Sequence, residues 1–285
     1  MTSQPSSEPA SQFTEREAQI VNVAHMVENG KTYWVAGGGS PLYAIILAKR
    51  SAAPQAQYIT EDGCIAPEPD LPLDPIMTMV AAKAGYRALQ WGNMNASGMH
   101  AQVGLMDYGI LNTLQVDRWG NVNSTATGDY EGEGRRFNGP GGADSIAALC
   151  WRTILMTDQQ KRKFVDHVDF VSSPGFLDGS EGARERAGLP RNTGPYKVVT
   201  PWAVFGYDSN RHLRLEEVAP WVTKEQVLAE MSFEPTLAPE IGVMEIPTED
   251  ELNTLRTELD VRGQTSDVGA WIIRNDDRSW TIAAP

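Results

Sequence analysis

The chain has 285 residues, of which 41% are apolar and 21% are charged, values typical of one large globular domain or two small ones. Its formal charge of -13 argues against nucleic acid as a partner, because binding a phosphate backbone requires clustered Lys and Arg. No apolar run reaches the roughly 18 residues of a spanning helix, and the N-terminus has no basic, apolar leader. We therefore expect no membrane partner and a cytoplasmic location.

The residue types that bind metals are scattered along the chain. Cys64 and Cys150 have no C-x-x-C spacing, and the 4 histidines form no H-x-x-x-H pair. We therefore expect no metal site.

The first elements in chain order follow a pattern of tail, helix, strand and helix. Residues 1–13 are rich in Ser, Pro and Gln, which predicts a disordered tail. A helix is expected from Thr14, whose spacing to Glu17 is that of a capping box, and Gly30 ends its pattern. Residues 32–36 predict a buried strand, and residues 41–53 predict a helix.

A glycine-rich turn joins that strand to that helix. It includes Gly38 and Gly39, and its free N–H groups can hold an anion at the start of the helix. The turn lacks the spacing of a dinucleotide site and the Lys of a phosphate loop. Close packing of the backbone therefore remains an alternative to ligand contact.

The next strand ends in a carboxylate on a tight turn. Tyr58 to Thr60 favour a strand, and Glu61 and Asp62 follow directly before Gly63, which can adopt positive φ. Ligands of α/β proteins bind at the carboxyl ends of strands, so Glu61 is well placed for chemistry. A solvated acidic loop is the alternative interpretation of this stretch.

The remaining helices and strands have less regular sequence patterns. We predict helices over 74–84, 144–151, 223–231 and 248–259, strands over 103–111, 168–172, 196–207 and 212–215, and a hairpin of 114–117 with 122–125. Residues 128–144 hold six glycines, so their backbone can approach a ligand closely, and 175–193 predict a surface loop. We see no clear linker, and we expect one domain over residues 14–262, followed by a C-terminal tail over 263–285.

Three separated motifs occur in the order found in one known family. They are Glu61-Asp62-Gly63, the hairpin sequence Q-V-D-x-x-G-N-V-N at residues 115–123, and the loop G-P-G-G-A at residues 139–143. The sequence V-D-F-V-S-S-P-G at residues 168–175 adds to them. Over roughly residues 15–260 the chain resembles the β subunit of class I coenzyme A transferases, most closely the glutaconate CoA-transferase branch.

The resemblance implies a fold, a partner and a mechanism. The fold would be an open α/β domain with a parallel-rich sheet flanked by helices, paired with a homologous α subunit, as an α2β2 heterotetramer. Glu61 would be the catalytic nucleophile, forming an acyl-glutamyl anhydride and then a glutamyl-CoA thioester. Coenzyme A would enter as the acyl-CoA substrate, with a carboxylic acid as acceptor and no permanently bound cofactor.

Further site residues are expected around Glu61. Backbone N–H groups can stabilise the oxyanion of acyl transfer or hold CoA, and the candidates are Gly63, Asn138, Gly139, Gly141, Gly142 and Ala143. The candidate substrate contacts are Gly38, Gly39, Gln115 and Asn121. Cys64 is an alternative nucleophile. The other interpretation is a reduced cysteine that only packs beneath the turn.

Two other functions remain as alternatives. Some relatives of the family hydrolyse a C–C bond of a CoA ester to open a ring in steroid-type catabolism, and such an enzyme would need no acceptor acid. The second alternative is a non-catalytic subunit that only completes the site of an α subunit. Retention of the carboxylate at Glu61 favours transfer.

Overall fold

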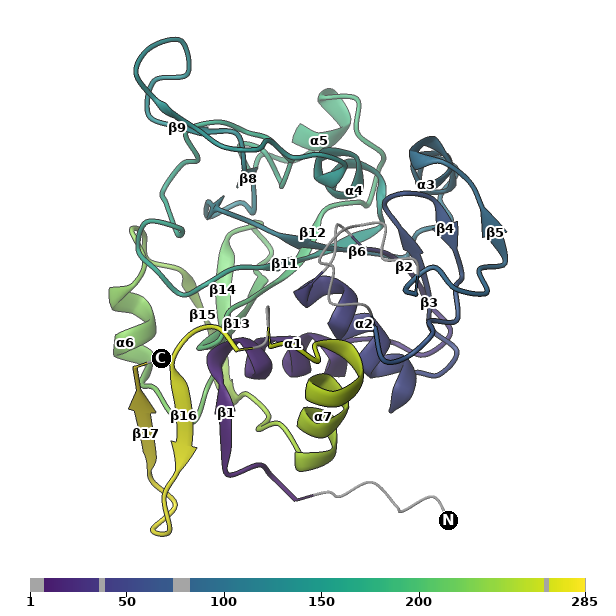
Figure 1. The fold of residues 1–285 in the computed structure, drawn as a ribbon. Coiled ribbons are helices and arrows are strands. Elements are labelled where there is room, and N and C mark those ends of the chain that lie inside the picture. The colour runs from purple at the N-terminus through teal and green to yellow at the C-terminus, as the bar shows by residue number, and fades with distance from the viewer. Residues whose placement is uncertain (1–7, 36–38, 74–82, 264–266, 285) are drawn as a thin grey trace.

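The computed structural model describes residues 8–35, 39–73, 83–263 and 267–284. Its centre is a ten-stranded mixed sheet (Figure 1). In spatial order the strands are β15 (Thr236–Val243), β14 (Leu213–Val218), β13 (Ala203–Tyr207), β12 (Pro195–Val199), β11 (Arg152–Met156), β6 (Tyr108–Asn112), β2 (Thr32–Val35), β3 (Gln57–Thr60), β4 (Cys64–Ile65) and β5 (Gln90–Trp91).

The middle of this sheet is parallel. Strands β3, β2, β6, β11 and β12 pair in parallel, whereas β13 and β4 pair antiparallel with their neighbours. In β2, Tyr33 and Val35 belong to one buried apolar cluster and Trp34 to the other, so both faces are covered. The carboxyl ends of β3, β2, β6 and β11 therefore lie at one common edge of the sheet.

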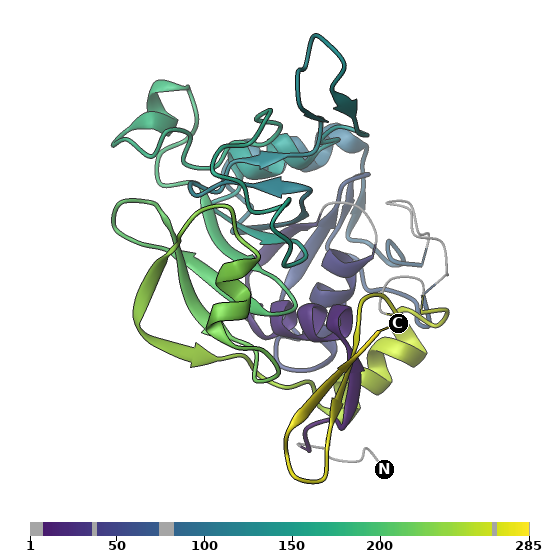
Figure 2. The same ribbon diagram turned by 90° about the vertical axis from the view of Figure 1, so that its left-hand side faces the viewer.

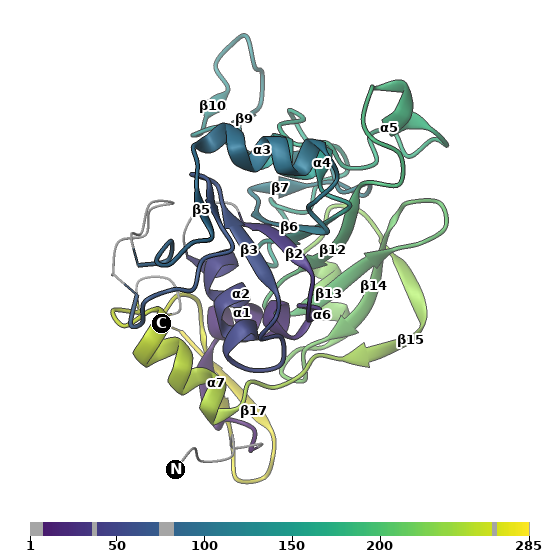
Figure 3. The same cartoon turned by 90° about the vertical axis from the view of Figure 1, so that its right-hand side faces the viewer.

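Helices cover both faces of the sheet. Figure 1 shows α1 (Glu15–His25), α2 (Ser40–Arg50) and α7 (Glu249–Thr254) on one side, and α3 (Met94–Gln102) and α4 (Ala143–Leu149) on the other. In Figure 3, α3 lies beside β5 and above β2 and β3. The remaining elements are α5 (Ala183–Arg186), α6 (Lys224–Ala229), the π-helical turn η1 (Leu255–Leu259), and the two-stranded ladders β7 (Gln115–Val116) with β8 (Val122–Asn123) and β9 (Ala126–Thr127) with β10 (Arg135–Arg136).

A second, small sheet joins the two ends of the chain. Strand β1 (Gln12–Thr14) pairs antiparallel with β16 (Trp271–Arg274), which pairs with β17 (Trp280–Ala283). Figure 2 shows the purple β1 beside the yellow β16 and β17. The sequence assigned residues 1–13 and 263–285 to tails, but in the described parts of these segments the apolar side chains of Phe13, Ile272 and Trp280 pack in the main core.

Several elements lie where the sequence predicts them. Capping boxes at Thr14, Thr223 and Thr248 start α1, α6 and α7, and β7 with β8 forms the predicted hairpin. The predicted helix over 74–84 falls mainly on residues 74–82, outside the described residues. The α/β class and the parallel-rich sheet flanked by helices are confirmed.

Two predicted strands are wrong or partly wrong. The strand expected over 103–111 begins only at Tyr108, because Val103 and Leu105 are exposed apolar residues that follow α3. Residues 168–172 form no strand, and only the next residue, Ser173, makes an isolated bridge to Val122. The polar loop predicted over 175–193 contains the short helix α5, with Arg184 buried.

Candidate active site

Glu61 lies directly after the carboxyl end of β3, at the edge where the parallel strands end. Its side chain is buried, with 6% of the residue surface exposed. Its Oε1 accepts a hydrogen bond of 2.6 Å from the backbone N–H of Gly142, which lies 81 residues further along the chain. The structure therefore brings the predicted carboxylate to the predicted glycine-rich loop.

The turn after Glu61 requires a glycine. Gly63 has φ of 98°, and a Cβ added there would lie 2.4 Å from the backbone oxygen of Asn93. Its N–H donates to the carbonyl of Thr60 at 3.0 Å, and its own carbonyl accepts from the N–H of Gly92 at 2.9 Å. Any side chain at this position would displace the turn that presents Glu61.

Side chains from the same strand end and from α3 fix this turn. The hydroxyl of Thr60 donates to the carboxylate of Asp62 and accepts from the N–H of Cys64 at 3.1 Å. The buried hydroxyl of Ser97, on α3, donates to the carbonyl of Thr60 at 2.8 Å. Asp62 is thus held by its own strand, while Glu61 is left to the glycine loop.

Cys64 is a poor nucleophile in this setting. The residue is 2% exposed, and burial raises the pKa of its thiol, although the neighbouring Thr60 hydroxyl has the opposite effect. The nearby carboxylate of Asp62, 4.0 Å from the sulfur, raises it further. Because the thiolate is the nucleophilic form, the geometry favours the packed interpretation of Cys64.

The glycines of the loop are close to the Glu61 carboxyl group. A Cβ at Gly142 would lie 2.7 Å from Oε1 and 3.1 Å from Cδ of Glu61, and one at Gly141 would lie 3.2 Å from Oε1. Gly142 is also the N-cap residue of α4, and Ala143 begins that helix as a buried residue. Only a backbone without side chains allows its N–H to approach the carboxylate this closely.

The other predicted glycine-loop and turn residues are less directly engaged with Glu61. Asn138 is exposed, and the N–H of Gly139 donates to the carbonyl of Ser124 at 3.0 Å. Gly39 precedes α2, with φ of 77°, and its carbonyl accepts from the N–H of Tyr43. Gly38 lies outside the described residues.

Gln115 and Asn121 are held by other protein groups. Gln115 accepts from Asn123 at 2.6 Å and donates to Asp169 at 3.0 Å. Asn121, 3% exposed, donates to Asp117 and to the carbonyl of Leu177, and it accepts from the backbone of residues 175 and 177. Asn121 therefore ties the hairpin to the following loop, whereas Gln115 also lines a cavity.

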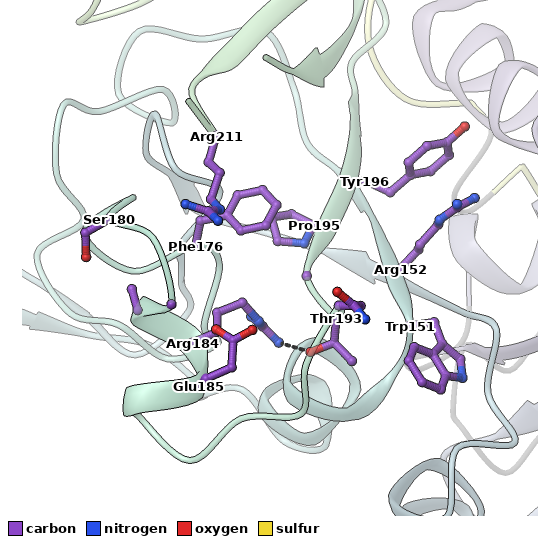
Figure 4. A pocket seen from close by; sticks show the side chains of 14 residues that line it. Trp151, Arg152, Phe176, Ser180, Arg184, Glu185, Thr193, Pro195, Tyr196 and Arg211 are labelled. Atoms are coloured by element: carbon purple, nitrogen blue, oxygen red, sulfur yellow. Dashed lines mark hydrogen bonds between the residues drawn. The ribbon is translucent and has the colours of Figure 1, made fainter. Parts of the chain in front are cut away.

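A separate cavity of about 300 Å³ lies at the opposite edge of the sheet (Figure 4). Its lining includes Trp151 and Arg152, at the amino end of β11, and Pro195 at the amino end of β12. Because β3, β2, β6, β11 and β12 are parallel, these amino ends lie away from Glu61. This cavity is therefore not part of the Glu61 site.

Arg184, which lines this cavity, is a buried cation that binds neutral groups. Figure 4 shows its bond to Thr193, and it also donates to the carbonyls of Ala147 and Ala148, near the end of α4, and of Pro174 and Gly175. Burial lowers its pKa to about 10. Sequence reasoning missed this residue, because an Arg in a polar, glycine-rich stretch usually lies on the surface.

Among the described residues, no group of three or more His, Cys, Asp or Glu side chains is arranged to hold a metal ion. Within the same residues, no helix has the length and apolar character needed to cross a membrane.

Comparison with known proteins identifies the class. The family model for coenzyme A transferase matches residues 72–230. The B subunit of glutaconate CoA-transferase from Acidaminococcus fermentans is 33% identical over 256 residues, which cover 87% of this chain and 93% of that protein. The chain therefore belongs to the coenzyme A transferase family.

Further relatives agree on the kind of subunit. The B subunit of 3-oxoadipate CoA-transferase from Pseudomonas knackmussii is 32% identical over 248 residues, covering 86% of this chain and 93% of that protein. The crystal structure of glutaconate coenzyme A-transferase from Acidaminococcus fermentans matches with a TM-score of 0.80 at 29% identity, covering 90% of this chain and 98% of that one. The chain is thus a CoA-transferase β subunit.

A more distant relative carries a different activity in its name. The cholesterol ring-cleaving hydrolase IpdB subunit of Rhodococcus jostii is 30% identical over 156 residues, which cover 54% of this chain and 59% of that protein. The match to the transferase subunits is longer, so the hydrolase interpretation is the weaker one.

Proposed function

We propose that this chain is the β subunit of an acyl-CoA:carboxylate CoA-transferase in which Glu61 carries the CoA group as a covalent thioester. The observation that supports it is the position of the Glu61 carboxyl group, at the carboxyl edge of the sheet and hydrogen-bonded to Gly142 at 2.6 Å. A carboxylate there can exchange with a thioester through an anhydride, without a metal or a redox cofactor.

The reaction would proceed in two matched halves. One carboxylate oxygen of Glu61 attacks the thioester carbonyl of acyl-CoA, and CoA leaves as a thiolate, giving an acyl-glutamyl anhydride. The thiolate then attacks Cδ of Glu61 and expels the first carboxylic acid as its carboxylate, leaving a glutamyl-CoA thioester. The acceptor acid repeats both steps in reverse order, which releases the new acyl-CoA and the free Glu61 carboxylate.

The Gly142 N–H would act during attack on Cδ of Glu61. When the thiolate or the acceptor adds to that carbon, negative charge develops on the oxygen that already accepts from Gly142. A donor held at this place by the start of α4 needs no reorganisation as the charge develops. The absence of a side chain at residues 141 and 142 allows the reacting carboxyl group to lie directly against the loop backbone.

We propose that a homologous α subunit completes the cleft, in an α2β2 assembly located in the cytoplasm. Support comes from the relatives, which are named as B subunits and which the chain covers almost completely. Within the described residues, Gly141 and Gly142 supply one wall beside Glu61. The remaining walls for acyl-CoA and acceptor would come from the partner.

The test is direct detection of CoA on Glu61. The complex of this chain with its α subunit is incubated with the CoA ester of glutaconate or of 3-oxoadipate, the acids named in two relatives. Intact mass measurement should show addition of CoA to this chain, and peptide mapping should place it at Glu61. Glu61→Gln should remove the adduct and lower transfer at least about a thousandfold.

Asp62→Asn is the matched control for Glu61→Gln. It neutralises the adjacent carboxylate, which bonds to Thr60 and not to the glycine loop. This variant should keep the adduct and most of the activity. Full transfer by the Glu61→Gln complex would refute the proposal.

The hydrolase alternative is separated by omitting the acceptor acid. A transferase then stops after one turnover with CoA bound to the chain, whereas a C–C hydrolase continues to form product. Continued turnover without acceptor would support the activity named for the Rhodococcus jostii relative.

A further inference from the structure

Another cavity, which we call the cationic cavity, has a volume of about 520 Å³. This volume is within the range of small-molecule sites. Its lining combines three cationic side chains, one aromatic ring and the Gln115 amide. The residues are Leu114, Gln115, Thr127, Arg135, Phe137, Arg162 and Lys163.

The cationic cavity lies on the Glu61 side of the sheet. Leu114 and Gln115 follow the carboxyl end of β6, and Arg162 and Lys163 follow that of β11. Phe137 is five residues before Gly142, so a fully extended chain between them spans at most about 18 Å. The cavity is therefore within reach of the catalytic carboxyl group by a long, flexible ligand.

The charge of the cationic cavity is unusual for this protein. The chain has a formal charge of -13, yet this lining contains three cations and no Asp or Glu. In the part of the chain that the structure describes, Arg135 and Arg162 make no ion pair, and Arg162 bonds through Nε to Gln160. Lys163 pairs with Asp158 at 2.5 Å.

Asp169 lies beside the cavity lining. It bonds to the Gln115 amide of that lining and not to Arg135 or Arg162. The carboxylate accepts the hydrogen bond of the Gln115 amide at 3.0 Å. The guanidinium of Arg135 lies 5.2 Å from the centre of the Phe137 ring. Two guanidinium groups without carboxylate partners among the described residues therefore remain available for an anionic ligand, since arginine binds phosphate oxygens through paired N–H donors.

We propose that the cationic cavity binds the phosphate groups of the coenzyme A moiety of the acyl-CoA substrate. The proposal rests on the proposed function, because it assumes that acyl-CoA reacts at Glu61. In CoA the pantetheine arm separates the reactive sulfur from the phosphates, so phosphate contacts must lie away from the catalytic carboxylate. The small acid that reacts at Glu61 needs no such distant contact.

The test compares two acyl donors that differ only in the nucleotide part that carries the phosphates. KM is measured with an acyl-CoA and with the same acyl group on pantetheine, using the complex with the α subunit. For the double variant Arg135→Ala/Arg162→Ala we expect KM for acyl-CoA to rise at least about tenfold, because charge-assisted hydrogen bonds are lost. KM for acyl-pantetheine should change less than about twofold, with kcat for acyl-CoA at saturation retained.

Arg50→Ala is the matched control. Arg50 ends α2, is exposed and pairs with Glu258 at 3.2 Å, so its loss removes the same type of charge elsewhere on the surface. It should leave both KM values unchanged. An unchanged KM for acyl-CoA in the double variant, or an equal rise for both donors, would overturn the proposal.

A binding measurement separates this proposal from that for Glu61. The dissociation constant of free CoA is measured by calorimetry with the Glu61→Gln complex, in which no thioester forms. Adding Arg135→Ala/Arg162→Ala should weaken CoA binding at least about tenfold, and the effect should diminish at high salt. If Glu61 proves not to be the nucleophile, this difference still reports on the cationic cavity. Equal CoA affinity with and without the two arginines would contradict it.

Discussion

The two ends of helix α4 differ in what binds their backbone groups. At its start, the N–H of Gly142 meets the carboxylate of Glu61, which belongs to another strand end. Near its end, the carbonyls of Ala147 and Ala148 accept from the buried guanidinium of Arg184. The start of α4 donates to a carboxylate, which can act as a nucleophile. The carbonyls near its end accept from a guanidinium, which only donates hydrogen bonds.

If Glu61 reacts as proposed, this difference separates function from stability within one short helix. Glu61 lies at the carboxyl edge of the parallel strands and Arg184 lines the cavity at their amino edge. Changes near Arg184 should therefore lower stability and leave the chemistry of the folded protein intact. Changes near Gly142 should have the opposite effect, and the following variants test this separation.

Arg184→Met should have the largest effect. It leaves four carbonyls, two of them buried and two part-buried, and the Thr193 hydroxyl without this donor, so we expect a loss of about 3 kcal/mol in the free energy of unfolding. The melting temperature should fall by about 6–12 °C. Thermal unfolding measures the loss, and kcat at low temperature should stay within a few fold of the unmodified protein.

The neighbouring Arg186→Met is the control for Arg184→Met. Arg186 is exposed, and among the described residues its side chain donates to Ser180 and to the carbonyl of Glu181, so its loss should cost less than about 1 kcal/mol. If both variants unfold at the same temperature, Arg184 does not stabilise this edge as argued.

Gly142→Ala should lower transfer about a hundredfold with little change in stability. The added Cβ would lie 2.7 Å from Oε1 of Glu61, so the carboxyl group must move away from its N–H donor. The φ of -83° at residue 142 suits alanine, and the fold should therefore tolerate the change. Steady-state kinetics and thermal unfolding of the α/β complex measure both effects.

Gly98→Ala provides a matched control for Gly142→Ala. Gly98 lies inside α3, and the nearest atom to an added Cβ is 3.9 Å away, on Trp34. This variant should keep full activity and unfold at the same or a slightly higher temperature. Wild-type kcat in Gly142→Ala would remove the catalytic role given to that loop.

His25 gives a small, pH-dependent effect remote from both ends of α4. Burial alone would lower its pKa, but the hydrogen bond to Glu251 at 2.5 Å and the charge of Glu245 raise it overall. A raised pKa in the folded state stabilises the protein below pH 6.5, and this contribution is lost as the pH rises through the folded value. The expected loss is about 1 kcal/mol or less.

Denaturant unfolding of the native chain and of His25→Gln between about pH 5.5 and 8.5 measures this contribution. The stability difference between the two proteins should shrink toward high pH. A difference that stays constant, or that grows with pH, would contradict the assignment.

The local elements could be predicted where short-range chemistry determines them. Thr14 with Glu17 indicated the start of one helix, and that capping box is present. A helix was also predicted from Thr248, and the structure adds a capping box to Glu251 there. The strand predicted from Val103 failed because Val103 is 72% exposed, although its apolar neighbours look like those of a buried strand. Strand β15 was missed, since Pro239 and Gly242 interrupt the pattern of an edge strand.

The candidate site could be predicted only in part. Glu61 and Gly63 form a local turn that the sequence displays. The contact of Glu61 with Gly142 joins residues 81 positions apart, and only the family motifs suggested that the glycine loop lies near Glu61. Arg184 had no local signal, because its acceptors come from α4 and from two loops that only the fold brings together. The cationic cavity likewise combines residues from separate segments of the chain.

The small sheet of β1, β16 and β17 determines when folding can finish during synthesis. The rings of Phe13 and Trp221 lie 5.3 Å apart, and Trp280 contacts both at 6.0 and 5.8 Å. A nascent chain that has not yet released residues 271–283 from the ribosome would leave this aromatic group open to water. The apolar surface of β1 therefore stays uncovered until a segment far along the chain has been synthesised.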